Sequence, residues 1–335
     1  MTVNFELRYA LRQPEHKGDD FQPRYQACIE QCAWGDKLGF TAVMISEHHG
    51  SPDGYMPSPM VIGGAIAAVT EKMRIRIASL VGPLHNPVRF AEDLATLDLL
   101  SNGRLEPCIS GGYVGSEFEA MGTSLANRKQ YMDEIVPFLH KAWTGQPFEW
   151  KGKTIRVTPR PVQRPGPPIW MGGTSKAAAR RAARHADVFY PPNRDVMATY
   201  YEELEKLGRK PPIRHRRRNM MVWLAEDPDE FWAEFGPSAL HENNVYGQWY
   251  LDWGAWNGYE IEDNVDTLRA TGRYPVVTPD ELVASIEELG GEATIMFHPM
   301  AGGAEPELAW KSLKLIENKV IPALHAKGIE TGGSQ

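Results

Sequence analysis

The sequence has few cysteines and no long apolar run. Three cysteines among 335 residues cannot all pair, and Cys28 and Cys32 stand one helical turn apart. This argues against a disulfide framework and indicates a cytoplasmic protein with reduced thiols. The longest apolar stretches, such as Met60–Val69, are too short and too rich in glycine to cross a bilayer. The stretch Met1–Glu6 has no basic residues followed by an apolar core, so we expect no secretion signal.

The chain also lacks a strong excess of charge of either sign. Its formal net charge of −7 is mild for this length and argues against general affinity for nucleic acid. One basic run, Arg214–Arg218, stands out from this background. We interpret it as a solvated loop before a strand. The alternative is a contact to the anionic tail of a cofactor.

What the chain does contain is a repeated alternation of short β-rich runs and longer helical patterns. Repeated β–α units predict a parallel sheet, and eight of them in a chain above roughly 250 residues predict a closed (β/α)8 TIM barrel. We expect one such domain over residues 1–335. The alternative, an open doubly wound sheet, would need a glycine-rich turn after its first strand, and Arg8–Leu11 is not one. The eight expected strands are Val3–Leu7, Thr41–Ile45, Arg74–Val81, Leu105–Ile109, Ile169–Met171, Val188–Tyr190, Met220–Leu224 and Thr294–Phe297.

Two segments interrupt this rhythm and are predicted to be insertions after strands four and seven. Gln146–Pro168 is rich in proline and has the pattern of a hairpin. Gly236–Val277 is rich in aromatic residues and glycine and has weak periodicity, which predicts a long functional loop or a lid. Within it, Tyr246–Tyr259 is interpreted either as the cover of a substrate site or as packing at a dimer interface or the surface.

Catalytic groups of barrel enzymes lie on the loops after the strands. After strand two comes Ser46–Gly50, which contains Glu47, His48 and His49. Adjacent histidines beside a carboxylate can supply a general acid or base. A metal would need three or more converging ligands, and the other strand ends do not offer them, so we expect no metal. For one of the two histidines, the alternative is a purely structural loop residue.

Two glycine-rich turns follow strands four and five. After strand five, Gly172, Gly173, Thr174 and Ser175 lead directly into a helix, an arrangement that exposes backbone N–H groups to an anion such as a phosphate. The alternative is an ordinary N-cap at Thr174 or Ser175. After strand four, Ser110–Gly112 can wrap around a ring or a phosphate, although glycine by itself indicates only a tight backbone.

Several of these pieces together resemble the bacterial luciferase-like monooxygenase superfamily. The similarity covers Asn4–Ala186 well, and the last third only through strand eight and its helix. No single piece is specific, but their order and spacing are. The matching pieces are Glu47–His49, Asn86–Asp93, Leu97–Leu105, Gly112–Tyr113, Glu117–Phe118 and Met121–Gly122.

The resemblance implies a flavin-dependent oxidoreductase. It implies a monooxygenase that takes reduced FMN from a separate flavin reductase and uses O2 on an organic, apolar substrate. One alternative is a deazaflavin-dependent dehydrogenase or reductase on the same barrel, and another is a flavin-binding protein without catalysis. By analogy with the family, we expect a homodimer formed through the helices after strands two and three.

The resemblance also assigns roles to individual residues. His48 is implied to be catalytic, with Glu47 beside it holding the loop and His49 facing the interior wall. The peptide between Ala78 and Ser79, at the end of strand three, is implied to be cis and to lie behind the flavin ring. The implied cofactor-binding positions are Ala78, Ser79 and Ser110 at the ring, and Gly111, Gly172, Gly173, Thr174 and Ser175 toward the phosphate. Gly111 departs from the family, because relatives carry there an arginine that pairs with the phosphate; this weakens flavin binding or gives the task to another arginine.

Overall fold

The eight expected strands are present in the computed structural model, which describes residues 2–191, 195–210, 218–254, 258–290 and 292–332. Their bounds differ from the expected ones by at most two residues at either end. The eight strands are β1 (Thr2–Tyr9), β2 (Ala42–Ile45), β3 (Arg74–Val81), β4 (Leu105–Ser110), β7 (Trp170–Met171), β8 (Val188–Phe189), β9 (Arg218–Leu224) and β11 (Glu292–Phe297).

The strands follow one another in the order of a (β/α)8 barrel. The sheet runs β9-β11-β1-β2-β3-β4-β7-β8, and every pairing along it is parallel. Within the described residues, ladder hydrogen bonds join each neighbouring pair of the barrel except β8 and β9. A short strand β12 (Glu330–Thr331) pairs with β1 at its start. Because all strands point the same way, their carboxyl ends share one face of the molecule.

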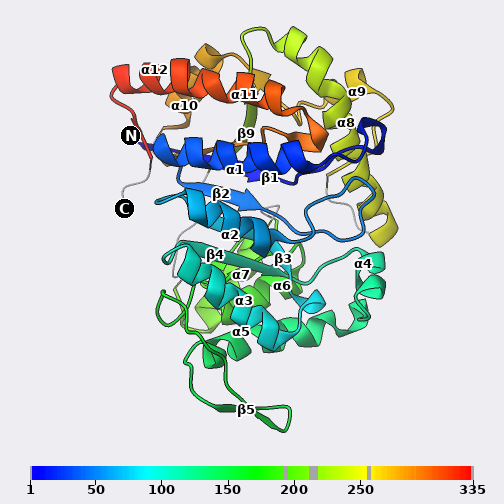
Figure 1. Cartoon of the computed structure of the whole chain (residues 1–335), viewed down its shortest axis with the longest axis vertical. Coiled ribbons are helices and arrows are strands. Elements are labelled where there is room, and N and C mark those ends of the chain that lie inside the picture. The colour runs from blue at the N-terminus through cyan, green and yellow to red at the C-terminus, as the bar shows by residue number, and fades with distance from the viewer. Residues whose placement is uncertain (1, 192–194, 211–217, 255–257, 291, 333–335) are drawn as a thin grey trace.

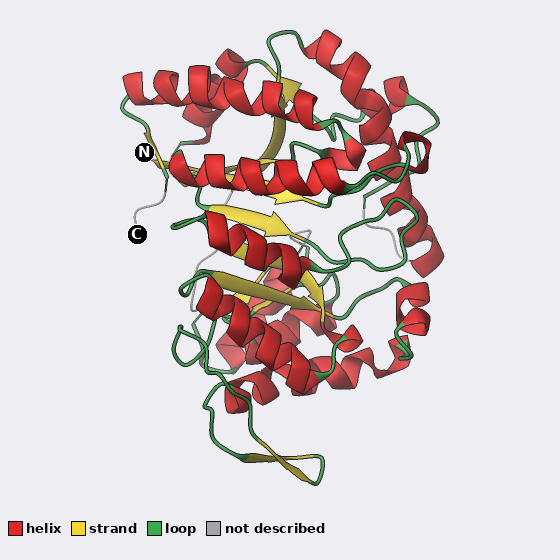
Figure 2. Cartoon of the chain, in the orientation of Figure 1, coloured by secondary structure: helices red, strands yellow, loops and turns green. Residues whose placement is uncertain are grey.

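Helices cover the outside of the strands (Figures 1 and 2). Several begin with proline in the first turn, where the missing N–H costs nothing. Helix α3, for example, starts at Pro87 and is capped by the Asn86 side chain, which accepts from the Val88 N–H at 3.0 Å. The helices on the outside are α1 (Gln22–Lys37), α2 (Pro59–Val69), α3 (Pro87–Leu100), α5 (Arg128–Ala142), α6 (Lys176–His185), α7 (Met197–Lys206), α10 (Pro279–Leu289), α11 (Pro306–Leu315) and α12 (Ile321–Ala326).

The insertion after strand four contains the expected hairpin. Strands β5 (Phe148–Trp150) and β6 (Lys153–Ile155) pair antiparallel and project from one end of the molecule (Figure 1). Lys151 and Gly152 form the two-residue turn, with φ of 47° and 75°. Positive φ at both turn residues is the geometry that matches the twist of a tight hairpin.

The insertion after strand seven is not the long loop expected from the sequence. Helix α8 (Pro228–Trp253) runs through the first half of Gly236–Val277, and α9 (Val265–Ala270) and β10 (Val276–Val277), which pairs with β9, follow. The expectation was wrong because it rested on the aromatic- and glycine-rich composition and the weak periodicity of this segment, which also contains Pro237. A buried stripe instead continues across Gly236 and Pro237 at helical spacing, through Phe231, Phe235, Ala239, Asn243 and Tyr246.

Charged side chains form a layer inside the barrel. Side chains alternate along a strand, so Val3, Phe5 and Leu7 of β1 pack under the helices while Glu6 points to the other side. The Arg76 guanidinium lies 2.9 Å from the Glu6 carboxylate and 2.7 Å from that of Glu106, and all three side chains are buried. The interior below the strand ends is therefore a closed ion network.

Other expectations have simple outcomes. Cys28, Cys32 and Cys108 are all buried and none forms a disulfide. The part of the chain that the structure describes holds no helix that is both long and apolar enough to cross a membrane. Most of the basic run, residues 214–217, lies outside the described residues, so neither interpretation of it is tested.

Candidate active site

The loops at the carboxyl ends of the strands surround a cavity of about 140 Å³. Helix α4 (Gly115–Ala120) and the end of α8 stand at this face of the barrel (Figure 1). The expected residues Glu47, His48, Ala78, Ser79 and Ser110 all line this one cavity, so the structure brings together what the sequence placed on separate strand ends. The other lining residues are Arg8, Ser46, Tyr55, Val81, Gly112, Tyr113, Glu117 and Tyr246.

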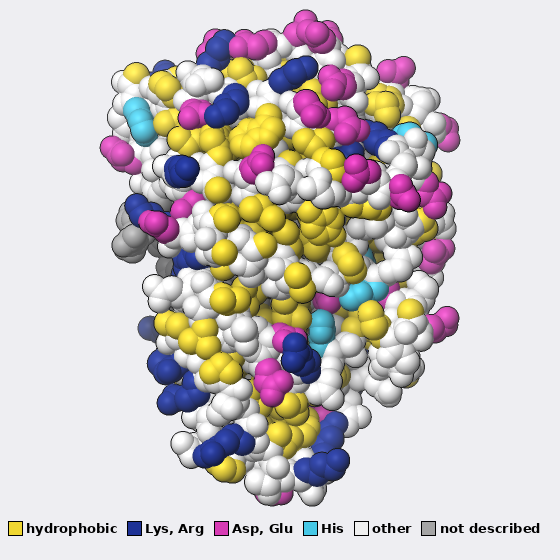
Figure 3. Space-filling model, viewed as in Figure 1, with side chains coloured by type: hydrophobic (Ala, Val, Ile, Leu, Met, Phe, Trp, Pro, Cys, Tyr) yellow, Lys and Arg dark blue, Asp and Glu magenta, His cyan; other side chains and the backbone are white. Residues whose placement is uncertain are grey.

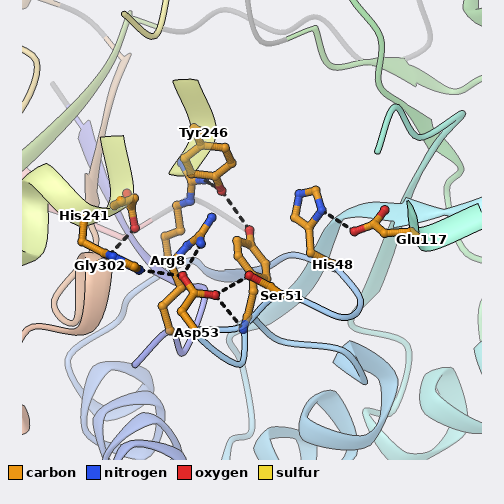
Figure 4. Close-up of polar contacts among 11 residues, drawn as sticks. Arg8, His48, Ser51, Asp53, Glu117, His241, Tyr246 and Gly302 are labelled. Atoms are coloured by element: carbon orange, nitrogen blue, oxygen red, sulfur yellow. Dashed lines mark hydrogen bonds and ion pairs between the residues drawn. The ribbon is translucent and has the colours of Figure 1, made fainter. Parts of the chain in front are cut away.

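His48 is held by a buried carboxylate. Its Nδ1 lies 2.7 Å from Oε1 of Glu117, which also accepts from the His49 backbone N–H at 2.9 Å (Figure 4). Burial lowers the pKa of His48, and the bond to Glu117 opposes this shift without cancelling it. A neutral imidazole that donates Nδ1–H to a carboxylate keeps its lone pair on Nε2. The arrangement therefore makes Nε2 of His48 a base in a buried cavity.

Glu47 ties the loop after β2 to β3. Its carboxylate lies 3.1 Å from Nε2 of His49 and 2.9 Å from Nε2 of His85, and it accepts from the Val81 N–H. Burial opposes ionisation, but these three bonds lower the pKa of Glu47 to about 2. Glu47 is therefore a permanent anion at neutral pH. Its bond to His49 raises the pKa of that histidine, whose ring is turned to Glu47.

The ring-wall positions lie at the ends of β3 and β4. The peptide between Ala78 and Ser79 is cis, as the resemblance implies. The Ala78 carbonyl accepts from Oγ of Ser46 at 2.9 Å, which fixes the end of β3 against the end of β2. Beside them the turn at Gly111 has room: a Cβ added there would lie 3.7 Å from Met132 and 3.9 Å from Cδ of Arg128.

The turn after β7 has free donors at the start of α6. Ser175 is the N-cap, with its hydroxyl accepting from the Ala178 N–H at 3.1 Å, so the simpler interpretation of that residue is confirmed. The backbone N–H groups of Gly173 and Thr174 have no acceptor among the described residues. Gly173 has a φ of 146°, and a Cβ on Gly172 would lie 3.1 Å from Oγ of Ser79. The turn is thus a small-residue cradle adjoining the ring-wall positions.

Aromatic side chains of α8 cover the cavity. The Trp249 ring lies over His48, with centroids 4.3 Å apart, and Tyr250 stacks on Tyr113 at 5.0 Å. Tyr246 lines the cavity itself. Of the two interpretations of Tyr246–Tyr259, this packing favours the cover of a site, because these rings contact the cavity residues of their own chain.

Two arginines near this cover were not anticipated from the sequence. Arg12 is fully buried, pairs with Asp53 at 2.5 Å and stacks over the ring of Tyr55. Arg8 lines the cavity at the end of β1. The signal for Arg8 was its position: it follows Glu6 by two residues, so it lies on the interior side of the strand where that strand ends.

A (β/α)8 barrel with a buried histidine and free backbone N–H groups at the carboxyl ends of its strands belongs to a class of folds whose sites lie at the mouth of the barrel. The sequence profile of the family described as luciferase-like monooxygenase matches residues 6–296. The chain belongs to this family.

Two curated relatives illustrate the family. The oxygenase component of the flavin-dependent trigonelline monooxygenase of Acinetobacter baylyi is 30% identical over 154 residues, which are 44% of this chain and 42% of the relative. The FMNH2-dependent dimethylsulfone monooxygenase of Pseudomonas putida is 34% identical over 139 residues, 39% of this chain and 38% of the relative. The matches thus span less than half the length of these two relatives.

Solved structures share the fold over nearly the whole chain. The oxygenating constituent of 3,6-diketocamphane monooxygenase of Pseudomonas putida, in complex with FMN, superposes with a TM-score of 0.73 at 19% identity and covers 96% of this chain and 99% of its own. An F420-dependent secondary alcohol dehydrogenase, in complex with an F420-acetone adduct, gives 0.66 at 18% identity, with coverage of 97% and 99%. At these identities the likeness shows the fold.

Proposed function

We propose that the protein is a monooxygenase that uses reduced FMN and O2 to oxidise an organic substrate. The observation that carries this proposal is the buried His48–Glu117 pair in a cavity whose wall is formed by Ala78, Ser79 and Ser110. Related proteins named as FMNH2-dependent or flavin-dependent monooxygenases support it.

The residues present fit a flavin phosphate. The free N–H groups of Gly173 and Thr174 stand at the N-terminus of a ten-residue helix, where the helix dipole favours an anion. Arg128 supplies a charge near Gly111: its Nη1 donates to the Gly112 carbonyl at 2.9 Å. In our proposal Arg128 takes over the task of the arginine that is absent at Gly111.

When bound, reduced flavin would supply the electrons that activate O2. The protein's own residues hold the proton and exclude water. Nε2 of His48 accepts or returns a proton at the cavity, and Glu117 keeps its ring oriented. The rings of Trp249, Tyr250 and Tyr113 close the cavity, as oxygen-dependent flavin chemistry requires. The present volume is below the roughly 300–1,000 Å³ usual for cofactor sites, so these rings must move apart when the flavin enters.

A deazaflavin is the second candidate cofactor, since an F420-dependent enzyme shares the fold. It would make the protein a dehydrogenase or reductase that works without O2. A flavin-binding protein without catalysis is the third candidate. Such a protein would not need a histidine that is oriented by a carboxylate. The contact between His48 and Glu117 therefore favours an enzyme.

We further propose a single barrel domain in a homodimeric, cytoplasmic protein that receives its reduced flavin from a separate reductase. The relative that is an oxygenase component supports the last point. Helices α2 and α3 leave large apolar side chains in solvent: Val61 is 74% exposed and Leu100 61%. Apolar side chains are frequent on the face that these helices share (Figure 3). This is the surface we propose for the dimer.

Anaerobic titration with reduced FMN and with reduced deazaflavin tests the proposed function. We expect reduced FMN to bind more tightly. We expect Arg128→Gln to weaken its binding about tenfold through loss of one charge-assisted hydrogen bond. Lys129→Gln, at the exposed neighbouring position, is the matched control. If the deazaflavin binds more tightly, the second candidate function replaces the first. If FMN binds Arg128→Gln as tightly as the wild type, Arg128 does not contact the phosphate.

A further inference from the structure

Arg8 is a charged side chain that lies at the cavity without a direct ion pair among the described residues. Its guanidinium lies at the end of β1 and lines the cavity, with Nη2 3.5 Å from the Tyr246 hydroxyl. Its Nε is buried without an acceptor. Within the described part of the chain, no carboxylate lies within ion-pair distance of it.

Two other buried arginines of the barrel are paired. Arg76 lies between Glu6 and Glu106, and Arg12 contacts Asp53. The nearby acids make their direct contacts elsewhere, although the charge of Glu242 also acts on Arg8. Asp53 also holds His241 at 2.8 Å. Glu242 accepts from the Gly302 N–H at 2.9 Å and lies 3.6 Å from His298. An arginine at a cavity whose Nε has no acceptor retains a donor for an anionic group from outside.

The surroundings of Arg8 form a wall of donors and aromatic rings. The hydroxyls of Tyr246 and Tyr55 lie 3.0 Å apart, and the Tyr246 oxygen also accepts from Nη2 of Arg8. Figure 4 shows Arg8 next to Tyr246, and His48 apart from both, beside Glu117. A molecule in this cavity would thus meet donors at one end and the Nε2 base of His48 at the other.

We propose that Arg8 binds the carboxylate of the substrate, and that the substrate is a small aromatic acid. The proposal rests on the proposed function, since it names the substrate class of the same cavity. The rings of Tyr55, Tyr113 and Tyr246 give the remainder of the cavity an aromatic lining. The substrate is therefore charged at one end, and not wholly apolar as the resemblance suggested.

Benzoate and benzamide, which have the same shape and differ in charge, test this assignment. Their binding to the flavin-free protein is measured by calorimetry, for the wild type, Arg8→Gln, Arg8→Lys and the exposed control Arg89→Gln. We expect benzoate to bind 10–100-fold more tightly than benzamide. Arg8→Gln should abolish this preference, Arg8→Lys should keep part of it, and Arg89→Gln should keep all of it. Thermal unfolding of each variant shows that it is folded.

Three results would overturn the assignment. The first is that benzoate and benzamide bind equally, or not detectably, at millimolar concentration. The second is that Arg8→Gln still prefers benzoate. The third is that Arg8→Gln keeps this preference but loses affinity for reduced FMN. The third result would mean that Arg8 binds the anionic cofactor and not the substrate. A different result would contradict the proposed function alone. In that case the wild type does not bind FMN, but it prefers benzoate and loses this preference in Arg8→Gln, so the present inference is retained.

Discussion

Replacing Glu117 with glutamine changes the charge that holds His48 and little else. A glutamine has the same size, and its carbonyl can still accept from the His48 ring or the His49 N–H. What disappears is the negative charge of the acceptor. The bond at 2.7 Å then becomes a neutral hydrogen bond, and the protonated form of His48 loses a favourable partner.

The size of the effect follows from the difference between the two kinds of bond. Hydrogen bonds to charged groups contribute about 1.5–3 kcal/mol and neutral ones about 0.5–1.5 kcal/mol, so the change costs about 1–1.5 kcal/mol. Since 1.36 kcal/mol corresponds to one pKa unit, the pKa of His48, already lowered by burial, should fall by about one further unit. If His48 must be neutral to work, the acid limb of the activity profile moves to lower pH by the same amount.

Histidine-labelled NMR titration reads both the pKa and the tautomer. We expect His48 of the wild type to carry its proton on Nδ1, and this preference to weaken in Glu117→Gln. Glu119→Gln is the matched control, because Glu119 lies on the same helix and is exposed. A wild-type ring protonated on Nε2, or a pKa of His48 that stays the same or rises in Glu117→Gln, would refute the reasoning.

Three further predictions concern the two histidines and the dimer surface. His48→Ala should lower turnover about 10²–10⁴-fold with little change in flavin affinity, whereas His49→Ala should mainly lower the free energy of unfolding, by about 1–2 kcal/mol. Because the bond to Glu47 raises the pKa of His49, its contribution is complete below the ordinary pKa of about 6.5 and is lost as pH rises through the raised value. Urea unfolding of His49→Ala should therefore show a larger deficit at pH 6 than at pH 9, and an equal deficit would contradict the ion pair. Val61→Asp should convert the dimer to a monomer in light scattering; a wild type that is itself monomeric would remove this surface from consideration.

The barrel was predictable because its signals are local and repeated. Each strand is a short apolar run bounded by polar residues or glycine, and each is followed by a helical pattern. Glu47 and His48 were found in the same way, since a strand end is recognisable from the pattern around it. The strand order then decides which of these ends meet, so Ala78, Ser79 and Ser110 come to line one cavity.

Long-range partners were harder to predict. Nothing near Glu117 shows that it contacts a histidine 69 residues earlier in the chain. Arg8 was passed over because a single arginine after a strand is common, and its lack of a carboxylate partner is visible only in three dimensions. Helix α8 was missed because its segment is rich in aromatic residues and glycine and its local periodicity is weak. Its buried face against the barrel outweighs both.

Helix α8 has one more consequence, which concerns how the family diversifies. The Trp249 ring that lies over His48 comes from an insertion, whereas His48 and the small-residue turn after β7 come from the strand ends of the barrel. Substitutions along one helix can therefore reshape what the pocket accepts while the chemistry beneath stays in place. Trp249, Tyr250 and Tyr246 are the positions at which a chain of this architecture can acquire a new substrate by a few inherited changes.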